Sequence, residues 1–324
     1  MVSCHNDHTN LVAHRTFFHD GESFLQAILT LSFLSSECGQ APLNNKIFGG
    51  EAATAGAWPW QVSIHITCDG DLCYCGGSLI NKDWVLSAAH CLQGFGTSDI
   101  MMYFGRLRRS GLNPYETNRT ASRIIIHHTF NNPKNDNDIG LIQLSSSVTF
   151  TDYIRPVCLA AAGSTFAAGT EIWVTGWGKL HSGGPFPDIL QEVQVPIVSN
   201  SDCYDAYGGL ITNNMICAGL IKVGGKGSCQ GDSGGPVVSW NGSLWIQSGI
   251  VSFAGVKCDD PRYPSVFTRV SQYQDWIATN IANNTPRFVE FNNNGFRSSL
   301  NLFLFSISLT FSIIPFTFSH YLSS

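Results

Sequence analysis

The segment Gly231-Asp232-Ser233-Gly234-Gly235-Pro236 places a serine among glycines, immediately before an apolar run. Taken alone, such a segment is often only a loop. Two segments upstream give it significance: Ser87-Ala88-Ala89-His90-Cys91 and Asp136-Asn137-Asp138-Ile139-Gly140-Leu141. A serine hydroxyl needs a base beside it to act as a nucleophile, and histidine titrates near neutral pH. A carboxylate can then orient the imidazole. The three segments therefore supply a candidate nucleophile, base and acid.

In this order the segments resemble the three signatures of the chymotrypsin/trypsin family. The resemblance covers about residues 38–282. Within that family the chain resembles membrane-anchored prostasin/testisin-like members. The resemblance implies an all-β fold of two packed six-stranded Greek-key barrels with a C-terminal helix. It implies a serine endopeptidase that cleaves protein or peptide substrates through an acyl-enzyme intermediate, without a cofactor or metal. His90 is then the general base, Asp138 the orienting acid and Ser233 the nucleophile. The backbone N–H groups of Gly231 and Ser233 would form the oxyanion hole.

The composition agrees with a folded, exported protein. Of the 324 residues, 44% are hydrophobic and 13% charged, which is too apolar for a disordered chain. The net charge of −5, without a long basic run, argues against nucleic-acid binding. Eleven cysteines favour a disulfide framework in an oxidising compartment. The sequons at Asn118, Asn241 and Asn283 predict glycosylation sites.

The middle of the chain reads as short strands separated by Gly, Pro, Asn and Ser clusters. Expected strand segments are 61–67, 84–87, 139–144, 172–175, 193–198 and 248–253. Near the end of this region, five apolar residues recur at helical spacing: Val270, Tyr273, Trp276, Ile277 and Ile281. These patterns predict an all-β domain closed by one helix.

The two ends read differently from the middle. The apolar run 24–34 suits a signal peptide, although the preceding residues are poorly basic, and a disordered tail is the alternative. The apolar stretch 300–318 lacks Lys or Arg after it and follows small residues and a polar spacer, which predicts a glycosylphosphatidylinositol anchor near Asn293 or Asn294. A single membrane span is the alternative.

These observations predict the division of the chain into segments. We expect an N-terminal extension with signal peptide (1–36), a propeptide (37–46), a catalytic domain (47–284) and a linker with anchor signal (285–324). The expected location is the secretory pathway, with the mature chain on the extracellular face of the plasma membrane or secreted.

The segment Lys46-Ile47-Phe48-Gly49-Gly50 resembles the family's activation site. Cleavage after Lys46, by a trypsin-like protease or by slow self-processing, would free the ammonium of Ile47. That ammonium would pair with Asp232 because a buried charge needs a partner. That pair would order the loop of Gly231 and Ser233. Phe48 departs from the usual Val, which affects local packing rather than the switch.

The resemblance also implies cysteine pairs, which spacing alone cannot give. They are Cys75–Cys91, Cys203–Cys217, Cys229–Cys258 and Cys38–Cys158, the last tying the propeptide to the catalytic chain. Cys68 and Cys73 flank the hairpin signal Asp69-Gly70 and would form an additional small disulfide. A metal site using Cys68, Cys73 and Cys75 is the rival interpretation.

The resemblance places the substrate pocket at Gly227, Ser228, Ser252, Phe253, Ala254 and Ser265. Trypsin-like members have an Asp six residues before the nucleophile, where this chain has Gly227. A buried substrate cation would be unpaired there, which is costly. We therefore expect a neutral pocket for small or medium apolar side chains. An aromatic preference is the alternative, and Asp259 or Asp260 could restore basic specificity if their loop folds inward.

Two rival functions remain at this stage. One is a binding protein on an inactive protease fold, although no triad residue is missing. The other is an adhesion or structural surface protein, although the sequence has no repeats or second module. The expected partners are substrates, an activating protease, protein inhibitors and, through the C-terminal anchor, a membrane.

Overall fold

The computed structural model describes residues 38–44, 50–130, 135–221, 223–224 and 227–293. The predicted signal peptide, the activation residues Lys46 and Ile47, and the apolar C-terminal stretch lie outside the described residues.

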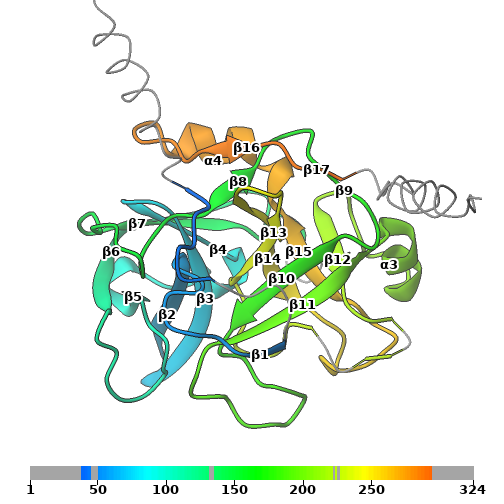
Figure 1. The fold of residues 1–324 in the computed structure, drawn as a ribbon, viewed down its shortest axis with the longest axis horizontal. Coiled ribbons are helices and arrows are strands. Elements are labelled where there is room, and N and C mark those ends of the chain that lie inside the picture. The colour runs from blue at the N-terminus through cyan, green and yellow to red at the C-terminus, as the bar shows by residue number, and fades with distance from the viewer. Residues whose placement is uncertain (1–37, 45–49, 131–134, 222, 225–226, 294–324) are drawn as a thin grey trace, which may run out of the picture. The chain divides into compact units, whose positions relative to one another are not determined.

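The first half of the described chain forms a closed antiparallel barrel, ordered β2-β3-β4-β7-β6-β5 with β5 returning to β2 (Figure 1). Its strands are β2 (Gln61–Cys68), β3 (Asp71–Asn81), β4 (Trp84–Ser87), β5 (Ile100–Phe104), β6 (Thr117–Ile126) and β7 (Gly140–Leu144). Asp69 (φ 46°) and Gly70 (φ 93°) connect β2 to β3, and both take the positive φ that a two-residue hairpin turn of this kind requires. The hairpin signal at Asp69-Gly70 is confirmed.

The second half forms another six-stranded ring, ordered β13-β10-β11-β12-β15-β14 and closed by the β13–β14 pairing. Its strands are β10 (Glu171–Gly176), β11 (Gln191–Val198), β12 (Met215–Ala218), β13 (Pro236–Trp240), β14 (Trp245–Phe253) and β15 (Ser265–Arg269). Short strands extend this sheet: β1 (Gly50–Ala52) pairs with β11, β8 (Cys158–Ala160) runs parallel to β14, and β16 (Phe288–Val289) runs parallel to β8. The prediction of two six-stranded barrels is confirmed.

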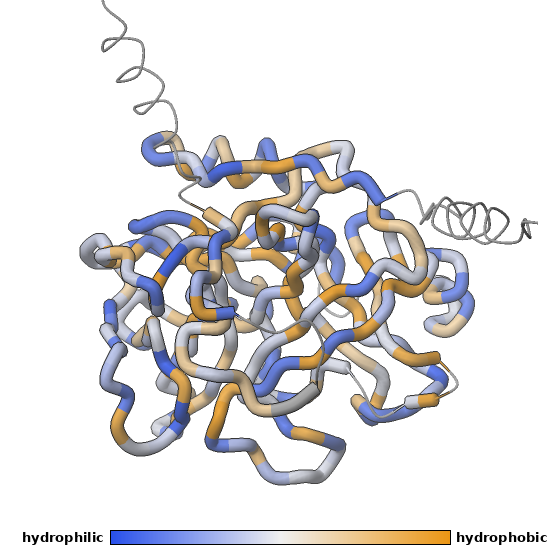
Figure 2. Tube along the Cα trace, in the orientation of Figure 1, coloured by the Kyte–Doolittle hydropathy of each residue, from blue (hydrophilic) through white to orange (hydrophobic). Residues whose placement is uncertain are grey.

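Alternating burial explains why these segments form strands. Along β5, Ile100, Met102 and Phe104 are buried while the residues between them are half-buried, which is the period of a strand with one face in a core. Figure 2 shows hydrophobic and hydrophilic residues interspersed along many of the strands. Five of the six predicted strand segments fall within strands of the structure, and the sixth, 139–144, begins one residue before β7.

The helices are short: α2 (Ala89–Leu92), α3 (Asn200–Ala206) and α4 (Gln274–Asn280), with single turns η1 (Thr97–Asp99) and η2 (Val270–Gln272). Val270, Tyr273, Ile277 and Ile281 are buried in the main apolar core, so the apolar spacing did mark the helical segment after the last barrel strand. No helix in the described ranges is long and apolar enough to cross a membrane.

The structure of residues 288–293 differs from the linker that was expected there. The sequence interpretation assigned residues from 285 onward to a linker, but β16 pairs with β8, and β17 (Asn292–Asn293) pairs with β9 (Thr165–Phe166). The physical reason is apolar burial, since Phe291 is 5% exposed and stacks on Phe166 with ring centroids 4.7 Å apart. This segment therefore belongs to the outer layer of the second barrel (Figure 1).

Candidate active site

The two barrels meet where a glycine-rich loop of the second approaches a strand of the first. The N–H of Gly76, in β3, donates to the carbonyl of Ser233 over 2.7 Å. Gly234 has φ +79°, and a Cβ there would lie 2.2 Å from Ser87 Oγ. A Cβ on Gly76 would lie 2.7 Å from the Cα of Gly235. These glycines carry no side chain, which leaves room for the loop that holds Ser233 to lie against the first barrel.

His90 and Asp138 come from the first barrel. His90 lies in α2, just after β4, and Asp138 lies two residues before β7. Nδ1 of His90 is 2.7 Å from Oδ2 of Asp138, and the backbone N–H of His90 donates to Oδ1 over 2.9 Å. The Asp138 side chain is fully buried, whereas 30% of the His90 side chain is exposed. A buried carboxylate thus orients an imidazole that keeps access to solvent.

The second barrel completes the surroundings of Asp138. Ser252 in β14 donates its hydroxyl to Oδ2 over 2.5 Å, and Thr268 in β15 donates to the Asp138 carbonyl over 2.7 Å. Ser252 was predicted only as a wall of the substrate pocket. Its bond to Asp138 has no local sequence signal, because the two residues are 114 positions apart and meet only when the barrels dock.

Gly231 and Asp232 shape the loop before the serine. Gly231 has φ +99°, and a Cβ there would lie 2.9 Å from the ring of Phe186, so glycine is required. The Asp232 carboxylate accepts from the N–H of Gly178 (2.7 Å) and from the N–H of Cys229 (2.9 Å). Burial raises the pKa of Asp232 to about 6, although both hydrogen bonds act to lower the pKa. The carboxylate is therefore held by backbone donors in a site that disfavours its charge.

A cavity of about 220 Å³ opens beside Ser233. Its walls include four residues predicted for the substrate pocket: Ser228, Ser252, Phe253 and Ala254. Gly227 and Ser265 are not among the residues that line this cavity, and their part in the substrate pocket stays a prediction. Both lie next to the lining residue Ser228: Ser265 Oγ accepts from the N–H of Ser228 over 3.1 Å, and a Cβ on Gly227 would be 2.8 Å from that Oγ.

Asp259 and Asp260 do not line this cavity either; they line a separate, much smaller one. The Asp260 carboxylate is bound by Arg262 at 2.7 Å and 3.0 Å, and the hydrogen bonds from Arg262 lower the pKa of Asp260 to about 2. No ionisable side chain is therefore found among the described residues that line the cavity beside Ser233.

Ten cysteines form five disulfides in the structure, and these are the pairs that the resemblance and the hairpin signal suggested: Cys38–Cys158, Cys68–Cys73, Cys75–Cys91, Cys203–Cys217 and Cys229–Cys258. The rival metal site at Cys68, Cys73 and Cys75 is wrong, because each of these sulfurs is bonded to another cysteine. Cys229–Cys258 joins two residues that line the cavity beside Ser233.

The three sequons lie on accessible parts of the molecule. Asn118, Asn241 and Asn283 are all exposed. Asn118 lies on β6, and the Asn241 side chain accepts from Ser243 and Leu244 in a surface turn. Their positions permit the predicted glycosylation.

Comparison with known proteins supplies the deciding observation. A model of the trypsin family matches residues 47–277. The chain belongs to the trypsin family. Its fold and its curated relatives are those of serine-type endopeptidases, so the family predicted from the three motifs is confirmed.

The relatives combine a shared protease region with different overall lengths. Tryptase of Mus musculus is 42% identical over 267 residues, which cover 77% of this chain and 95% of the relative. Transmembrane protease serine 11C of Mus musculus is 40% identical over 76% of this chain, and transmembrane protease serine 5 of Homo sapiens is 36% identical over 76%. This chain spans only 57% and 54% of the lengths of those two relatives.

Proposed function

We propose that this protein is an active serine endopeptidase with His90, Asp138 and Ser233 as its catalytic residues. The observation that carries the proposal is the buried Asp138 carboxylate bound to Nδ1 of a partly exposed His90, at the barrel contact where Gly76 holds the Ser233 backbone. A buried ion pair contributes little net stability, so a carboxylate buried against a partly exposed imidazole favours a catalytic role over a purely structural one.

The geometry supports a two-step acyl transfer. His90 takes the proton of the Ser233 hydroxyl as that oxygen attacks the substrate carbonyl, and later gives the proton to the leaving amine. Asp138 fixes the imidazole tautomer and stabilises the imidazolium. The backbone N–H groups of Gly231 and Ser233 bind the oxyanion, and one such donor contributes on the order of 3–4 kcal/mol to the transition state. Water then releases the acyl group by the reverse route.

Cleavage after Lys46 is the proposed activation step. Support comes from Asp232, whose buried carboxylate has a raised pKa and lies next to Ser233 in the chain. A new ammonium at Ile47 would stabilise the ionised form of Asp232. The pair would hold Gly231 and Ser233 in the arrangement that binds an oxyanion. Lys46 at the cut site points to an activating protease of trypsin-like specificity.

The preferred residue before the scissile bond is a small or medium apolar one. The cavity beside Ser233 has a volume of about 220 Å³ and has Phe253, Ala254 and Val256 in its lining. Gly227 supplies no carboxylate, and Asp260 is held by Arg262. A substrate Arg or Lys would therefore lose hydration without gaining a partner.

An extracellular setting fits the five disulfides and the three exposed sequons. We propose that the chain enters the secretory pathway and is held at the cell surface by its apolar C-terminal stretch, through a lipid anchor or a single span. Two of the relatives are named transmembrane proteases, which is consistent with a membrane location. Phosphatidylinositol-specific phospholipase would release the lipid-anchored form from cells. Retention on the cells would contradict the lipid anchor. Protein inhibitors are the further expected partners.

The test of the proposed function is peptide hydrolysis by the full chain cut after Lys46. Peptides with Ala, Val or Leu before the scissile bond should be cleaved, and the Ser233→Ala variant, cut in the same way, should not cleave them. A wild-type chain no faster than Ser233→Ala would overturn the proposal and favour a binding role on an inactive fold. Cleavage much faster after Arg than after Ala, Val or Leu would overturn only the pocket assignment.

A further inference from the structure

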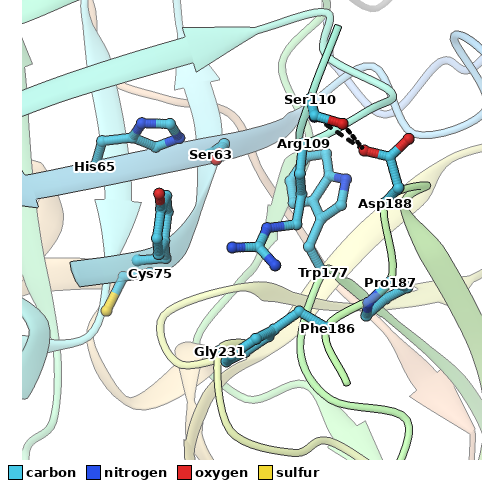
Figure 3. A pocket seen from close by; sticks show the side chains of 11 residues that line it. Ser63, His65, Cys75, Arg109, Ser110, Trp177, Phe186, Pro187, Asp188 and Gly231 are labelled. Atoms are coloured by element: carbon cyan, nitrogen blue, oxygen red, sulfur yellow. Dashed lines mark hydrogen bonds between the residues drawn. The ribbon is translucent and has the colours of Figure 1, made fainter. Parts of the chain in front are cut away.

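A second, larger cavity lies beside the candidate oxyanion loop. It measures about 400 Å³, and its walls include Tyr74, Cys75, Arg109, Trp177, Phe186 and Gly231 (Figure 3). It shares no lining residue with the cavity beside Ser233, although the segment 230–233 contributes to both. We consider a substrate bound with the carbonyl oxygen of its scissile bond at Gly231 and Ser233. The side chain before the scissile bond then occupies the smaller cavity. The residues after the scissile bond must therefore lie outside the smaller cavity. The larger cavity is next to that carbonyl position.

Arg109 is the charged group that projects into this cavity (Figure 3). Its guanidinium lies 4.7 Å from the ring centroid of Phe186 and 4.9 Å from that of Tyr74. These two cation–π contacts hold the guanidinium in place on an aromatic wall. Within the described ranges, no carboxylate lies at salt-bridge distance from Arg109.

The acidic groups nearby are already bound. Asp188 lines the cavity, but its carboxylate accepts from the N–H and hydroxyl of Ser110 at 2.9 and 2.7 Å (Figure 3). It also accepts from Arg108 at 2.9 Å. The hydrogen bonds to Ser110 are the largest cause of the lowered pKa of Asp188. The Glu116 carboxylate is also bound, by the Arg106 guanidinium. Neither carboxylate is therefore available to neutralise Arg109.

The other titratable groups at the cavity leave its potential positive. Lys179 Nζ lies 5.3 Å from the Phe186 ring centroid, which adds a second cation at the wall. Burial, followed by the charge of Arg106, lowers the pKa of His65 to about 4, and Arg109 adds to that shift. His65 is then neutral near pH 7. The cavity presents the Arg109 guanidinium, which has no salt-bridge partner among the described residues. The Lys179 ammonium is not part of the lining but lies near its Phe186 wall.

We propose that Arg109 selects substrates with an Asp or Glu side chain at the first or second residue after the scissile bond. This inference rests on the proposed endopeptidase function and specifies which substrate residues are preferred on the leaving-group side of the scissile bond. A carboxylate entering the cavity would gain charge-assisted hydrogen bonds from a guanidinium that is already positioned. A Lys or Arg side chain there would be repelled.

The experiment uses the full chain cut after Lys46 and internally quenched peptides that differ at one position after the bond, which carries Glu, Gln or Lys. We expect kcat/KM for the Glu peptide to exceed that for the Gln peptide by about three- to tenfold, with the Lys peptide slowest. The advantage should shrink at high salt, because the charges are only partly buried. Arg109→Gln should bring the Glu/Gln ratio to about one, and Arg109→Glu should make Lys the preferred residue.

A matched control is Arg123→Gln, which removes the same charge from an exposed site on β6 and should leave the Glu/Gln ratio as in the wild type. Equal cleavage of the three peptides by the wild type would overturn the role of Arg109 while leaving the endopeptidase function intact. An unchanged Glu preference in Arg109→Gln would also overturn it. Failure to cleave any peptide would overturn both proposals.

Discussion

Asp138 and Ser252 join the two barrels at the candidate active site. The Ser252 hydroxyl, from β14, donates over 2.5 Å to the same Oδ2 atom that lies 2.7 Å from Nδ1 of His90. The carboxylate that orients the imidazole is thus held from both sides of the barrel interface. The relative position of the barrels therefore controls the geometry of the proposed base.

Removing the Ser252 hydroxyl should weaken both stability and catalysis. A buried hydrogen bond to a charged group contributes about 1.5–3 kcal/mol, so Ser252→Ala should lower the free energy of unfolding by about that amount. It should also lower kcat, because Asp138 loses one of the contacts that fix it. Denaturant unfolding and steady-state kinetics on the cut chain measure the two effects. Ser146→Ala, at an exposed serine outside the sequons, should stay within about 0.5 kcal/mol of the wild type. An equal effect of both variants would contradict the assignment.

Asp232 should give the uncut chain a particular dependence on pH. Its pKa rises from 3.8 to about 6 on burial, so the folded chain binds more protons than the unfolded chain between these values. Stability from this group is present below pH 4 and is lost as pH rises to 6, on the order of 3 kcal/mol in total. Asp232→Asn lacks this loss, so its stability relative to the wild type should rise across that window.

The same variant distinguishes the two forms of the chain. After cleavage at Lys46, the Ile47 ammonium should keep Asp232 ionised, and the wild-type loss of stability between pH 4 and 6 should shrink. Unfolding of the wild type and Asp232→Asn at several pH values, cut and uncut, gives the comparison. A difference that is flat with pH in the uncut chain would show that burial does not raise the pKa.

A carboxylate placed at Gly227 should change the residue preferred before the scissile bond. A Cβ there meets the Ser265 hydroxyl at 2.8 Å, which is a side-chain atom that can rotate away. Gly227→Asp, alone or with Ser265→Gly, should therefore increase cleavage after Arg or Lys relative to Leu by tenfold or more, because the cation gains a partner. Paired peptide substrates measure the ratio. If the ratio does not change in the double variant, Gly227 does not lie under the substrate side chain.

Phe291 should anchor the chain after α4. It is 5% exposed and packs with Cys38, Cys158 and Ile246 in addition to its stacking on Phe166. Phe291→Ala should cost about 3 kcal/mol or less in unfolding free energy, since this outer segment can open on its own. Cleavage by added trypsin at the exposed Arg287 should become faster. Phe150→Ala, at a residue that is 36% exposed, serves as the control and should change neither measurement appreciably.

The sequence predicted those features that short motifs or apolar spacing can encode. His90, Asp138 and Ser233 each lie in a distinctive local segment, and runs rich in Val, Ile, Trp and Thr, such as 172–175, marked strands. β16 and β17 were not predicted, because each has two residues and pairs with a strand more than 120 positions away. Such short pairs have too few residues to show a period.

The environments of the predicted residues were harder to infer. Ser265 has no sequence feature that shows it would bind Ser228 rather than line the cavity, since the contact depends on how two loops pack. The cavity around Arg109 combines residues from six separated segments of the chain. A run of three arginines among residues 106–109 was the one available signal, and only the structure shows that Arg106 and Arg108 are paired with carboxylates.

Covalent labelling of Ser233 tests the central claim most directly. An organophosphonate serine probe should modify the full chain cut after Lys46, and peptide mapping should place the modification on Ser233. Labelling should be much slower in the uncut chain and in His90→Ala, because the first lacks the ordered oxyanion loop and the second lacks the base. No labelling of Ser233 in the cut wild type, or equal labelling of His90→Ala, would contradict a serine nucleophile activated by His90.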